Sequence, residues 1–129
     1  MILVLRTDKP EAEIGLYDDS RRLAYESWHA HRQLSVTIHH RIQKLLDGQN
    51  MTWQDISGAI IYKGPGSFTG IRIGISVANA LVGGLQIPVA GTTGHEWIKQ
   101  GIELLKNGQG SKYALPEYGA PVHTTKPRK

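Results

Sequence analysis

The first part of the chain alternates between short apolar runs and polar breaks, a pattern that predicts β-strands. The opening run "ILVLRT" has the length and composition of a short buried strand, and "AEIGLYD" and "RLAYESW" follow it. The group Asp18-Asp19-Ser20 separates the last two runs and is rich in residues that form tight turns. The chain is therefore predicted to begin with three strands, of which the second and third form a hairpin.

Apolar residues then recur at the spacing of helical turns. The stripe that predicts the first helix ends at Asp47-Gly48 and consists of Leu34, Ile38, Ile42 and Leu45. The stretch "TWQDI" predicts a short turn capped by Thr52. Thr93 and Glu96 have the spacing of a capping box, which predicts the start of the last helix. Between the first and last helices the pattern predicts a strand over 57–63, a helix over 68–85 and a strand over 88–91, and the last helix is expected to end near Lys106.

This order of three strands, helix, strand, helix, strand and helix predicts an α/β fold with a mixed five-stranded sheet of the ribonuclease-H-like type. One half of an actin-like ATPase has this fold. In such ATPases the nucleotide lies between two halves of this kind, and the sequence is expected to hold one half.

Composition narrows the classes of function. With 129 residues, of which 40% are hydrophobic and 20% charged, the chain is expected to form one globular domain. It contains no cysteine, which excludes disulfides, thiolate metal sites and cysteine nucleophiles. Its apolar runs are shorter than a secretory signal or a membrane span. We therefore expect a cytoplasmic protein that does not enter a membrane.

The formal net charge of +4 is concentrated near the C-terminus. Residues 1–109 hold 11 Lys and Arg against 10 Asp and Glu, whereas residues 110–129 hold four basic residues and one acidic residue. We expect residues 1–109 to form the α/β domain and residues 110–129 to form a basic tail that contains proline and glycine. Within this tail, "YALPEY" is predicted to dock on the domain or on a partner. "TTKPRK" is predicted to stay free, either as a solubilising terminus or in contact with RNA phosphates.

The glycine-rich stretch "GPGSFTG" joins a predicted strand to a predicted helix, where backbone amides can bind an anion. It is not a Walker A loop, which has a lysine and then Ser or Thr after its last glycine, because Ile71 and Arg72 follow Gly70 here. Two alternatives stay open, a purely structural turn and a phosphate site. The weak candidates for a phosphate or cofactor site are Gly64, Gly66 and Ser67.

No other set of residues completes a catalytic or metal site. The four histidines His29, His31, His39 and His40 fall close together, yet none stands in an H-E-x-x-H or H-x-x-x-H pattern. For Ser67 as a nucleophile, no histidine and acidic residue stand at a spacing that would complete a catalytic triad. We therefore predict no catalytic residue, no metal and no cofactor of the chain's own.

Beyond its glycine spacing, the stretch "KGPGSFTGIRIGISVANALVGG" resembles the signature of the TsaB (YeaZ) family, which serves the synthesis of threonylcarbamoyladenosine in tRNA. The resemblance continues in "HRQLSVTIHHRIQKLL" and "IPVAGTTGHEWI" and covers about residues 1–105. It implies a non-catalytic accessory subunit that binds the related catalytic subunit TsaD through its first two helices. It also implies an assembly that includes the ATPase TsaE, with ATP and metal on these partners and an indirect contact with tRNA.

Two features depart from the family pattern. The family usually has an acidic residue near the end of its first strand, in the pattern L-x-x-D-T, whereas this chain reads "LVLRTD" with Arg6 at that position. In actin-like ATPases this carboxylate helps to hold the metal, and a guanidinium cannot replace it. Most family members also carry a second domain, whereas this chain is expected to pass almost directly from its last predicted helix to its tail. Both departures argue against nucleotide chemistry by this chain alone.

The second predicted helix, "IRIGISVANALVGGL", is almost entirely apolar or small, whereas a surface helix normally has a polar face. Its small residues Gly70, Gly74 and Ala78 lie one turn apart and predict a groove that a partner helix can approach closely. The predicted partner interface consists of Leu34, Ile38, Ile42, Phe68, Gly70, Arg72, Gly74, Ala78 and Leu81. Three alternatives stay open: a weaker homodimer in the absence of the partner, burial of this helix by its own domain, and a small nucleotide-binding or kinase-like enzyme that acts as a dimer.

Overall fold

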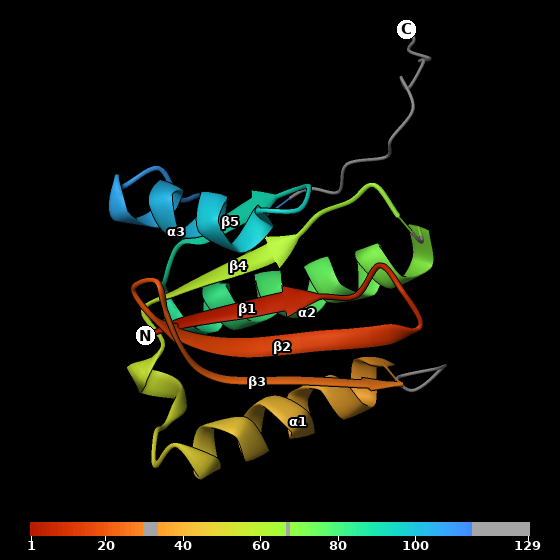
Figure 1. Cartoon of the computed structure of the whole chain (residues 1–129), viewed down its shortest axis with the longest axis horizontal. Helices are drawn as coiled ribbons and strands as arrows, with labels where there is room; N and C mark the ends of the chain where they lie inside the picture. The colour runs from red at the N-terminus through yellow and green to blue at the C-terminus, as the bar shows by residue number, and fades with distance from the viewer. Residues whose placement is uncertain (30–33, 67, 115–129) are drawn as a thin grey trace, which may run out of the picture.

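Five strands form one sheet with helices on both of its faces (Figure 1). The computed structural model of the chain describes residues 1–29, 34–66 and 68–114. The strands are β1 (Ile2–Arg6), β2 (Glu11–Asp18), β3 (Arg21–His29), β4 (Gly58–Tyr62) and β5 (Val89–Thr92). The helices are α1 (Leu34–Gly48), the 3-10 turn η2 (Trp53–Asp55), α2 (Phe68–Leu85) and α3 (Trp97–Lys106). Across these described residues, no helix combines the length and the apolar character that a membrane span requires.

The sheet is mixed and has the strand order β3-β2-β1-β4-β5. β2 pairs antiparallel with both β1 and β3, whereas β4 pairs parallel with both β1 and β5. Val4 marks the register, because it lies opposite Gly15 on β2 and Ile60 on β4. The carboxyl ends of β1, β4 and β5 therefore meet at one edge of the sheet, and the loops that follow these strands begin there.

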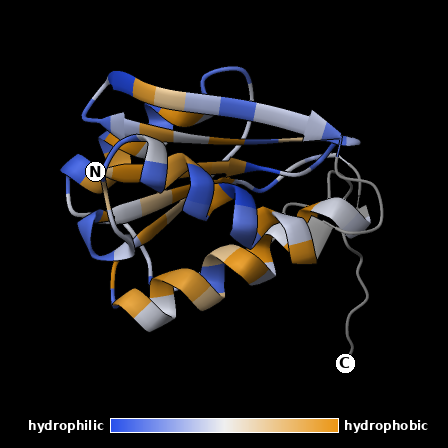
Figure 2. Cartoon of the chain, turned by 90° about the horizontal axis from the view of Figure 1, so that it is seen from below, coloured by the Kyte–Doolittle hydropathy of each residue, from blue (hydrophilic) through white to orange (hydrophobic). Residues whose placement is uncertain are grey.

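Alternating side chains of the strands fill two apolar clusters, one on each face of the sheet. Leu5 and Ile61 pack with α1 and α2 on one face of the sheet, and Figure 1 shows α2 behind β1 and β4. Val4 and Ile60 face the opposite way and pack with α3. The helix can come this close because Gly101 has no side chain. A Cβ atom at Gly101 would lie only 2.5 Å from the Ile60 side chain. The strand pairing confirms the predicted α/β fold with a mixed five-stranded sheet, and Figure 2 shows hydrophobic residues on the strands and on the helices that pack against them.

Most predicted elements are confirmed, with small changes at their ends. α1 ends at Gly48 and α2 spans residues 68–85, as the apolar spacing predicts. The second and third strands form the predicted hairpin, and Asp19 in its turn has a φ of 57°. η2 begins after Thr52, whose backbone amide donates to the Asp55 carboxylate at 2.8 Å. The turn predicted in "TWQDI" is therefore present.

The capping box predicted at Thr93 and Glu96 is wrong. α3 begins at Trp97, and Glu96 is its N-cap residue without forming a side-chain capping hydrogen bond. Gly94 has a φ of 85° and turns the chain before the helix. Trp97 is buried against the sheet, and its carbonyl accepts a 2.7 Å hydrogen bond from the hydroxyl of Thr92. Burial of Trp97 and this contact with β5 therefore fix the start of α3.

Residues 110–114, which we call the edge segment, lie beside β5. Ser111 and Val89 exchange two backbone hydrogen bonds of 2.8 Å each. The carboxamide of Asn79 on α2 accepts from the Ala114 amide at 2.7 Å and donates to the Ala114 carbonyl at 3.0 Å. The first residues of the predicted tail are thus bound to the domain, and the rest of that tail lies outside the described residues.

Candidate functional site

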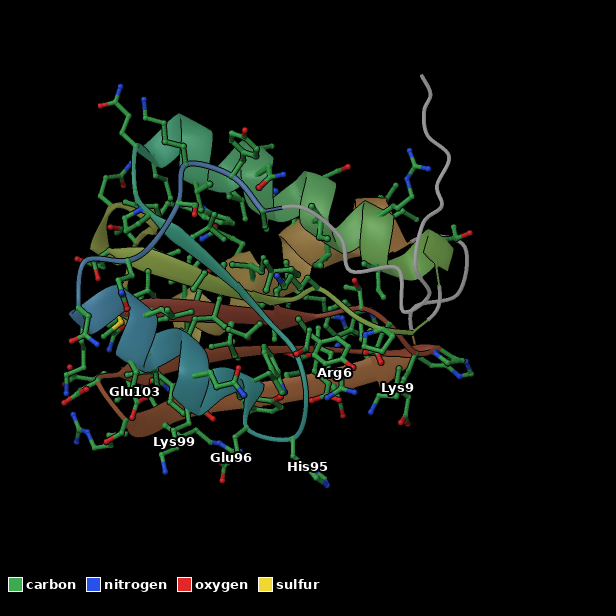
Figure 3. All side chains as sticks on the ribbon, turned by 90° about the horizontal axis from the view of Figure 1, so that it is seen from above. Arg6, Lys9, His95, Glu96, Lys99 and Glu103 are labelled. Atoms are coloured by element: carbon green, nitrogen blue, oxygen red, sulfur yellow. The ribbon has the colours of Figure 1, made fainter. Side chains whose placement is uncertain are left out.

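A hollow of about 480 Å³ lies between α3 and the turn that joins β2 to β3. Its lining includes four residues before and along α3 that Figure 3 labels: His95, Glu96, Lys99 and Glu103. Lys106 also lines it and forms an ion pair of 3.3 Å with Asp19. Acidic and basic groups are mixed in this lining, so the hollow has no dominant charge that would select an anion or a cation.

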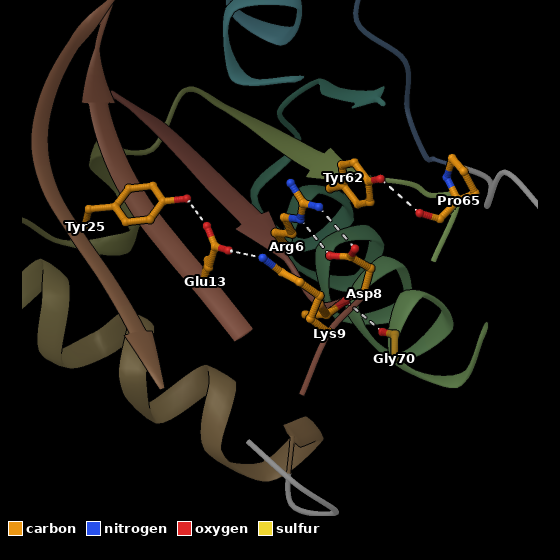
Figure 4. Close-up of polar contacts among 9 residues, drawn as sticks. Arg6, Asp8, Lys9, Glu13, Tyr25, Tyr62, Pro65 and Gly70 are labelled. Carbon is orange, nitrogen blue, oxygen red and sulfur yellow. Dashed lines mark hydrogen bonds and ion pairs between the residues drawn. The ribbon is translucent and has the colours of Figure 1, made fainter. Parts of the chain in front are cut away.

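An ion pair occupies the sheet edge at which β1 and β4 end (Figure 4). Arg6, the last residue of β1, donates from Nε to Asp8 Oδ1 at 2.7 Å and from Nη2 to Asp8 Oδ2 at 3.2 Å. The Asp8 side chain is only 6% exposed, so its charge is compensated mainly by this bidentate pair. The guanidinium carbon lies 3.9 Å from the centroid of the Tyr62 ring. The hydrogen bond to Asp8 raises the pKa of Arg6, which therefore stays a cation.

The glycine loop that follows β4 packs against this ion pair. A Cβ atom at Gly66 would lie 2.6 Å from Asp8 Cβ and 3.0 Å from Asp8 Oδ2, so a side chain does not fit there. The Tyr62 hydroxyl donates to the Pro65 carbonyl at 2.9 Å and ties the loop to β4. A phosphate placed against Gly66 would meet the Asp8 carboxylate. This arrangement favours the structural turn over the phosphate site.

The other candidates for phosphate or metal binding do not come together. Gly64 belongs to the same loop and has a φ of 110°, and Ser67 lies outside the described residues. His39 stacks on the Trp53 ring with the two ring centroids 4.8 Å apart. In the part of the chain that the structure describes, no group of three or more His, Asp or Glu side chains is placed to hold a metal ion.

A second polar network, which the sequence did not predict, lies beside the ion pair on β2 and β3 (Figure 4). The Tyr25 hydroxyl donates to Glu13 Oε1 at 2.5 Å, and Lys9 Nζ lies 3.2 Å from Glu13 Oε2. Burial raises the pKa of Tyr25, and the hydrogen bond to Glu13 raises it further. The hairpin register could have predicted this network, because it places Tyr25 opposite Gly15. A Cβ atom at Gly15 would lie 2.6 Å from the Tyr25 ring, so the glycine makes room for the ring.

Several residues of the predicted partner interface are buried in the chain's own core. Ile38, Ile42 and Ala78 are 0%, 0% and 2% exposed and belong to the apolar cluster between the sheet and the helices α1 and α2. Gly74 faces the residue that follows β1, since a Cβ atom at Gly74 would lie 2.0 Å from Thr7 Oγ1. These four predicted residues pack against their own sheet and are not available to a partner, so their assignment to the interface is corrected.

The remaining predicted interface residues differ in exposure. Arg72 is exposed, Gly70 and Leu81 are partly exposed, and the side chains of Leu34 and Phe68 lie outside the described part. Arg72 is also the single charged residue among the 18 residues of α2. The exposed positions of α2, which we call the α2 face, are Thr69, Arg72, Ser76, Ala80, Gly83 and Gly84. This face is small and weakly polar, whereas the buried side of the helix fills the core.

Three comparisons with known proteins agree with one another. The family model of TsaD, tRNA N6-adenosine threonylcarbamoyltransferase, matches residues 28–109. The tRNA threonylcarbamoyladenosine biosynthesis protein TsaB is 32% identical over 95 residues in Bacillus subtilis (strain 168) and 30% identical over 112 residues in Escherichia coli (strain K12). The solved structure of YeaZ from Pseudomonas aeruginosa is similar to this chain, with a TM-score of 0.59 and 31% sequence identity.

These similarities cover most of this chain but less than half of each relative. The two TsaB matches span 74% and 83% of this chain, against 42% of the Bacillus subtilis protein and 46% of the Escherichia coli protein. The structural match covers 71% of this chain and 43% of YeaZ.

Proposed function

Because the chain belongs to the TsaB (YeaZ) family, we propose that it is an accessory subunit in the biosynthesis of threonylcarbamoyladenosine in tRNA. In this role it binds a TsaD-like catalytic subunit and does not itself catalyse the transfer of the threonylcarbamoyl group. The names of the curated relatives support the pathway. The assembly is cytoplasmic and includes a TsaE-like ATPase, and it brings this chain to the tRNA.

The α2 face is the observation that carries the proposal of partner binding. Its small side chains let a second helix approach closely, at the short end of the roughly 8–10 Å between the axes of packed helices. α1 packs beside α2 on the same face of the sheet, and its Val36 is 73% exposed. A single exposed apolar side chain such as Val36 is common on protein surfaces, so the proposal rests on the small side chains of the α2 face. The same surface supports a weaker homodimer in the absence of the partner.

The sheet edge supports a role without catalysis. The resemblance to actin-like ATPases places a metal near the end of the first strand, where this chain has Arg6. Both oxygens of Asp8 accept hydrogen bonds from Arg6, and the guanidinium would repel a divalent cation at this edge. The residues present therefore do not fit a metal, and we assign ATP and metal to the partner subunits.

The proposal is tested by reconstitution with the TsaD-like protein of the same organism. We expect the wild-type chain to co-purify with that protein and to be required for tRNA modification by the complex. Ala80→Trp places a large side chain on the α2 face and is expected to weaken this binding at least about tenfold, a change of about 1.4 kcal/mol. Lys99→Trp is the matched control, because Lys99 is exposed on α3 at the other face of the sheet.

Both variants should unfold at the wild-type temperature, since both positions are exposed. Equal partner binding by Ala80→Trp and wild type would contradict the α2 face as the interface. A wild-type chain that does not bind the TsaD-like protein would contradict the proposed function. ATP hydrolysis by the purified chain alone would instead support the alternative of a dimeric nucleotide-binding enzyme.

A further inference from the structure

A groove of about 590 Å³ lies where the edge segment passes the ends of β4 and β5. Its described lining consists of Lys63, Gly91, Ser111, Lys112, Tyr113 and Ala114. Tyr113 is 61% exposed and is one of two large hydrophobic side chains that stand out from the described surface. The described lining includes two lysines and no Asp or Glu, so these residues present positive charge to the groove.

The backbone on both sides of Tyr113 is held by the domain. Ser111 is bound to Val89 by two hydrogen bonds, and Ala114 is bound to the Asn79 side chain by two more. Ala114 is also 6% exposed, which seats the end of the edge segment in the core. The Tyr113 ring is therefore presented from an anchored backbone, and a ligand that binds to it has less backbone ordering to bring about.

The two lysines reach the groove by different routes. A Cβ atom at Gly91 would lie 3.1 Å from Lys63 Cδ, so the missing side chain lets the Lys63 stem cross β5 toward the edge segment. Lys112 is exposed on the edge segment itself. Neither ammonium group forms an ion pair with a carboxylate of the described residues. Both cations thus remain available for an external anion.

The exposed surface continues past Lys112 into a second hollow of about 510 Å³. This hollow also has Ser111 and Lys112 in its lining and reaches Val82 and Gly83 in the last turn of α2. Both hollows are lined by Ser111 and Lys112, so they adjoin each other as a path along the edge segment. A linear ligand with repeated anionic groups suits such a path.

We propose that this groove binds an unpaired nucleotide of RNA, with the base stacked on Tyr113 and the flanking phosphates near Lys63 and Lys112. An aromatic ring combined with cations is the usual arrangement of single-strand binding sites, because every base has a π face and every link carries a negative charge. The inference rests on the proposed function, which supplies a tRNA as the RNA. It adds a direct contact between this chain and RNA. We favour RNA over an acidic protein partner because one nucleotide and its flanking phosphates use the face of the ring and both lysines together.

The test is a titration of the full chain against a fluorescein-labelled single-stranded RNA oligonucleotide, followed by anisotropy at several salt concentrations. Tyr113→Ala is expected to lower the affinity about 5- to 150-fold, whereas Tyr113→Phe keeps the stacking surface and stays near wild type. Lys63→Gln and Lys112→Gln are each expected to flatten the plot of log affinity against log salt by about 0.7. Lys44→Gln removes the same charge from an exposed position of α1 and is the matched control.

The inference is overturned if Tyr113→Ala binds the oligonucleotide as tightly as Tyr113→Phe, or if the groove lysines change the salt dependence no more than Lys44 does. It is also overturned if Tyr113→Ala loses the TsaD-like subunit while its RNA affinity is unchanged, because the groove is then a protein contact. Co-purification of each variant with the TsaD-like subunit is measured separately. Normal RNA binding by a chain that does not bind the TsaD-like subunit would contradict the proposed function alone. Subunit binding without RNA binding would contradict the proposed RNA site alone.

Discussion

Gly74→Ala tests how closely α2 approaches β1. The added methyl group would lie 2.0 Å from Thr7 Oγ1 and 3.0 Å from Thr7 Cβ, closer than atoms in real structures come. Thr7 has little freedom to move aside, because it is 1% exposed and its hydroxyl donates to the Gly70 carbonyl at 2.7 Å. The substitution is therefore expected both to strain the packing of the helix on β1 and to break this hydrogen bond.

The magnitude follows from three terms. Overpacking a filled core costs about 1–3 kcal/mol. Loss of the buried hydrogen bond of Thr7 costs about another 1–3 kcal/mol. Replacing Gly74 by alanine inside a helix returns about 1 kcal/mol of helix propensity. The net expectation is a loss of about 1–5 kcal/mol in the free energy of unfolding.

The assay is urea unfolding followed by far-ultraviolet circular dichroism and tryptophan fluorescence, with the two probes compared to confirm a single transition. Gly83→Ala is the matched control on the same helix, because a Cβ atom at Gly83 would meet nothing within 4 Å. The control is expected to raise the free energy of unfolding by about 0.5–1 kcal/mol. The two chemically identical substitutions should thus shift the urea midpoint in opposite directions.

A double variant separates the steric contact from other effects. Thr7→Ala removes the oxygen that the new methyl group would meet, so Gly74→Ala should cost less in that background than in the wild-type chain. If Gly74→Ala and Gly83→Ala stabilise the chain equally, the close approach of α2 to Thr7 is wrong. If Thr7→Ala leaves the cost of Gly74→Ala unchanged, that cost does not come from Thr7.

Two further results are expected from the polar networks. Arg6→Ala leaves the Asp8 carboxylate buried without its partner and should lower the free energy of unfolding by about 1–3 kcal/mol. The variant that combines Arg6→Ala with Asp8→Ala should recover part of this loss in urea unfolding, and a double variant less stable than the single one would refute the role of the pair. Burial and Glu13 raise the pKa of Tyr25, so the folded chain keeps a proton that the unfolded chain loses above about pH 10. The contribution of Tyr25 is therefore present below about pH 10 and is lost as the pH rises, and Tyr25→Phe should show a shallower fall of unfolding free energy over this alkaline range. Equal slopes for the two chains would show that the tyrosine proton is not linked to folding.

The sequence predicts the order and type of the elements because each has a strong local signal. The limits of α2 follow from the glycine loop before it and from the long run of apolar and small residues within it. The start of α3 could not be predicted in this way. Thr93 and Glu96 satisfy a local rule, but burial of Trp97 is a tertiary effect that overrides it.

The sequence predicts the candidate site less well, because helical periodicity groups residues on one side without saying what covers that side. Ile38 and Ile42 form one stripe as predicted, and the chain's own sheet buries it. Gly74 has the same ambiguity, since a glycine can make room for a partner helix or for a strand of its own domain. The ion pair at the sheet edge had a readable signal, because Arg6 and Asp8 are two residues apart at the end of a strand and can share one side.

The edge segment is held at both ends through its main chain, at Ser111 and at Ala114. Neither anchor involves the side chains of Lys112 and Tyr113, so these two residues can be substituted without weakening the attachment. The length of the segment is fixed instead, because a residue inserted between two anchored ends would have to bulge outward and carry the ring of Tyr113 with it. Substitution thus alters the chemistry of this surface in place, whereas insertion or deletion alters its geometry.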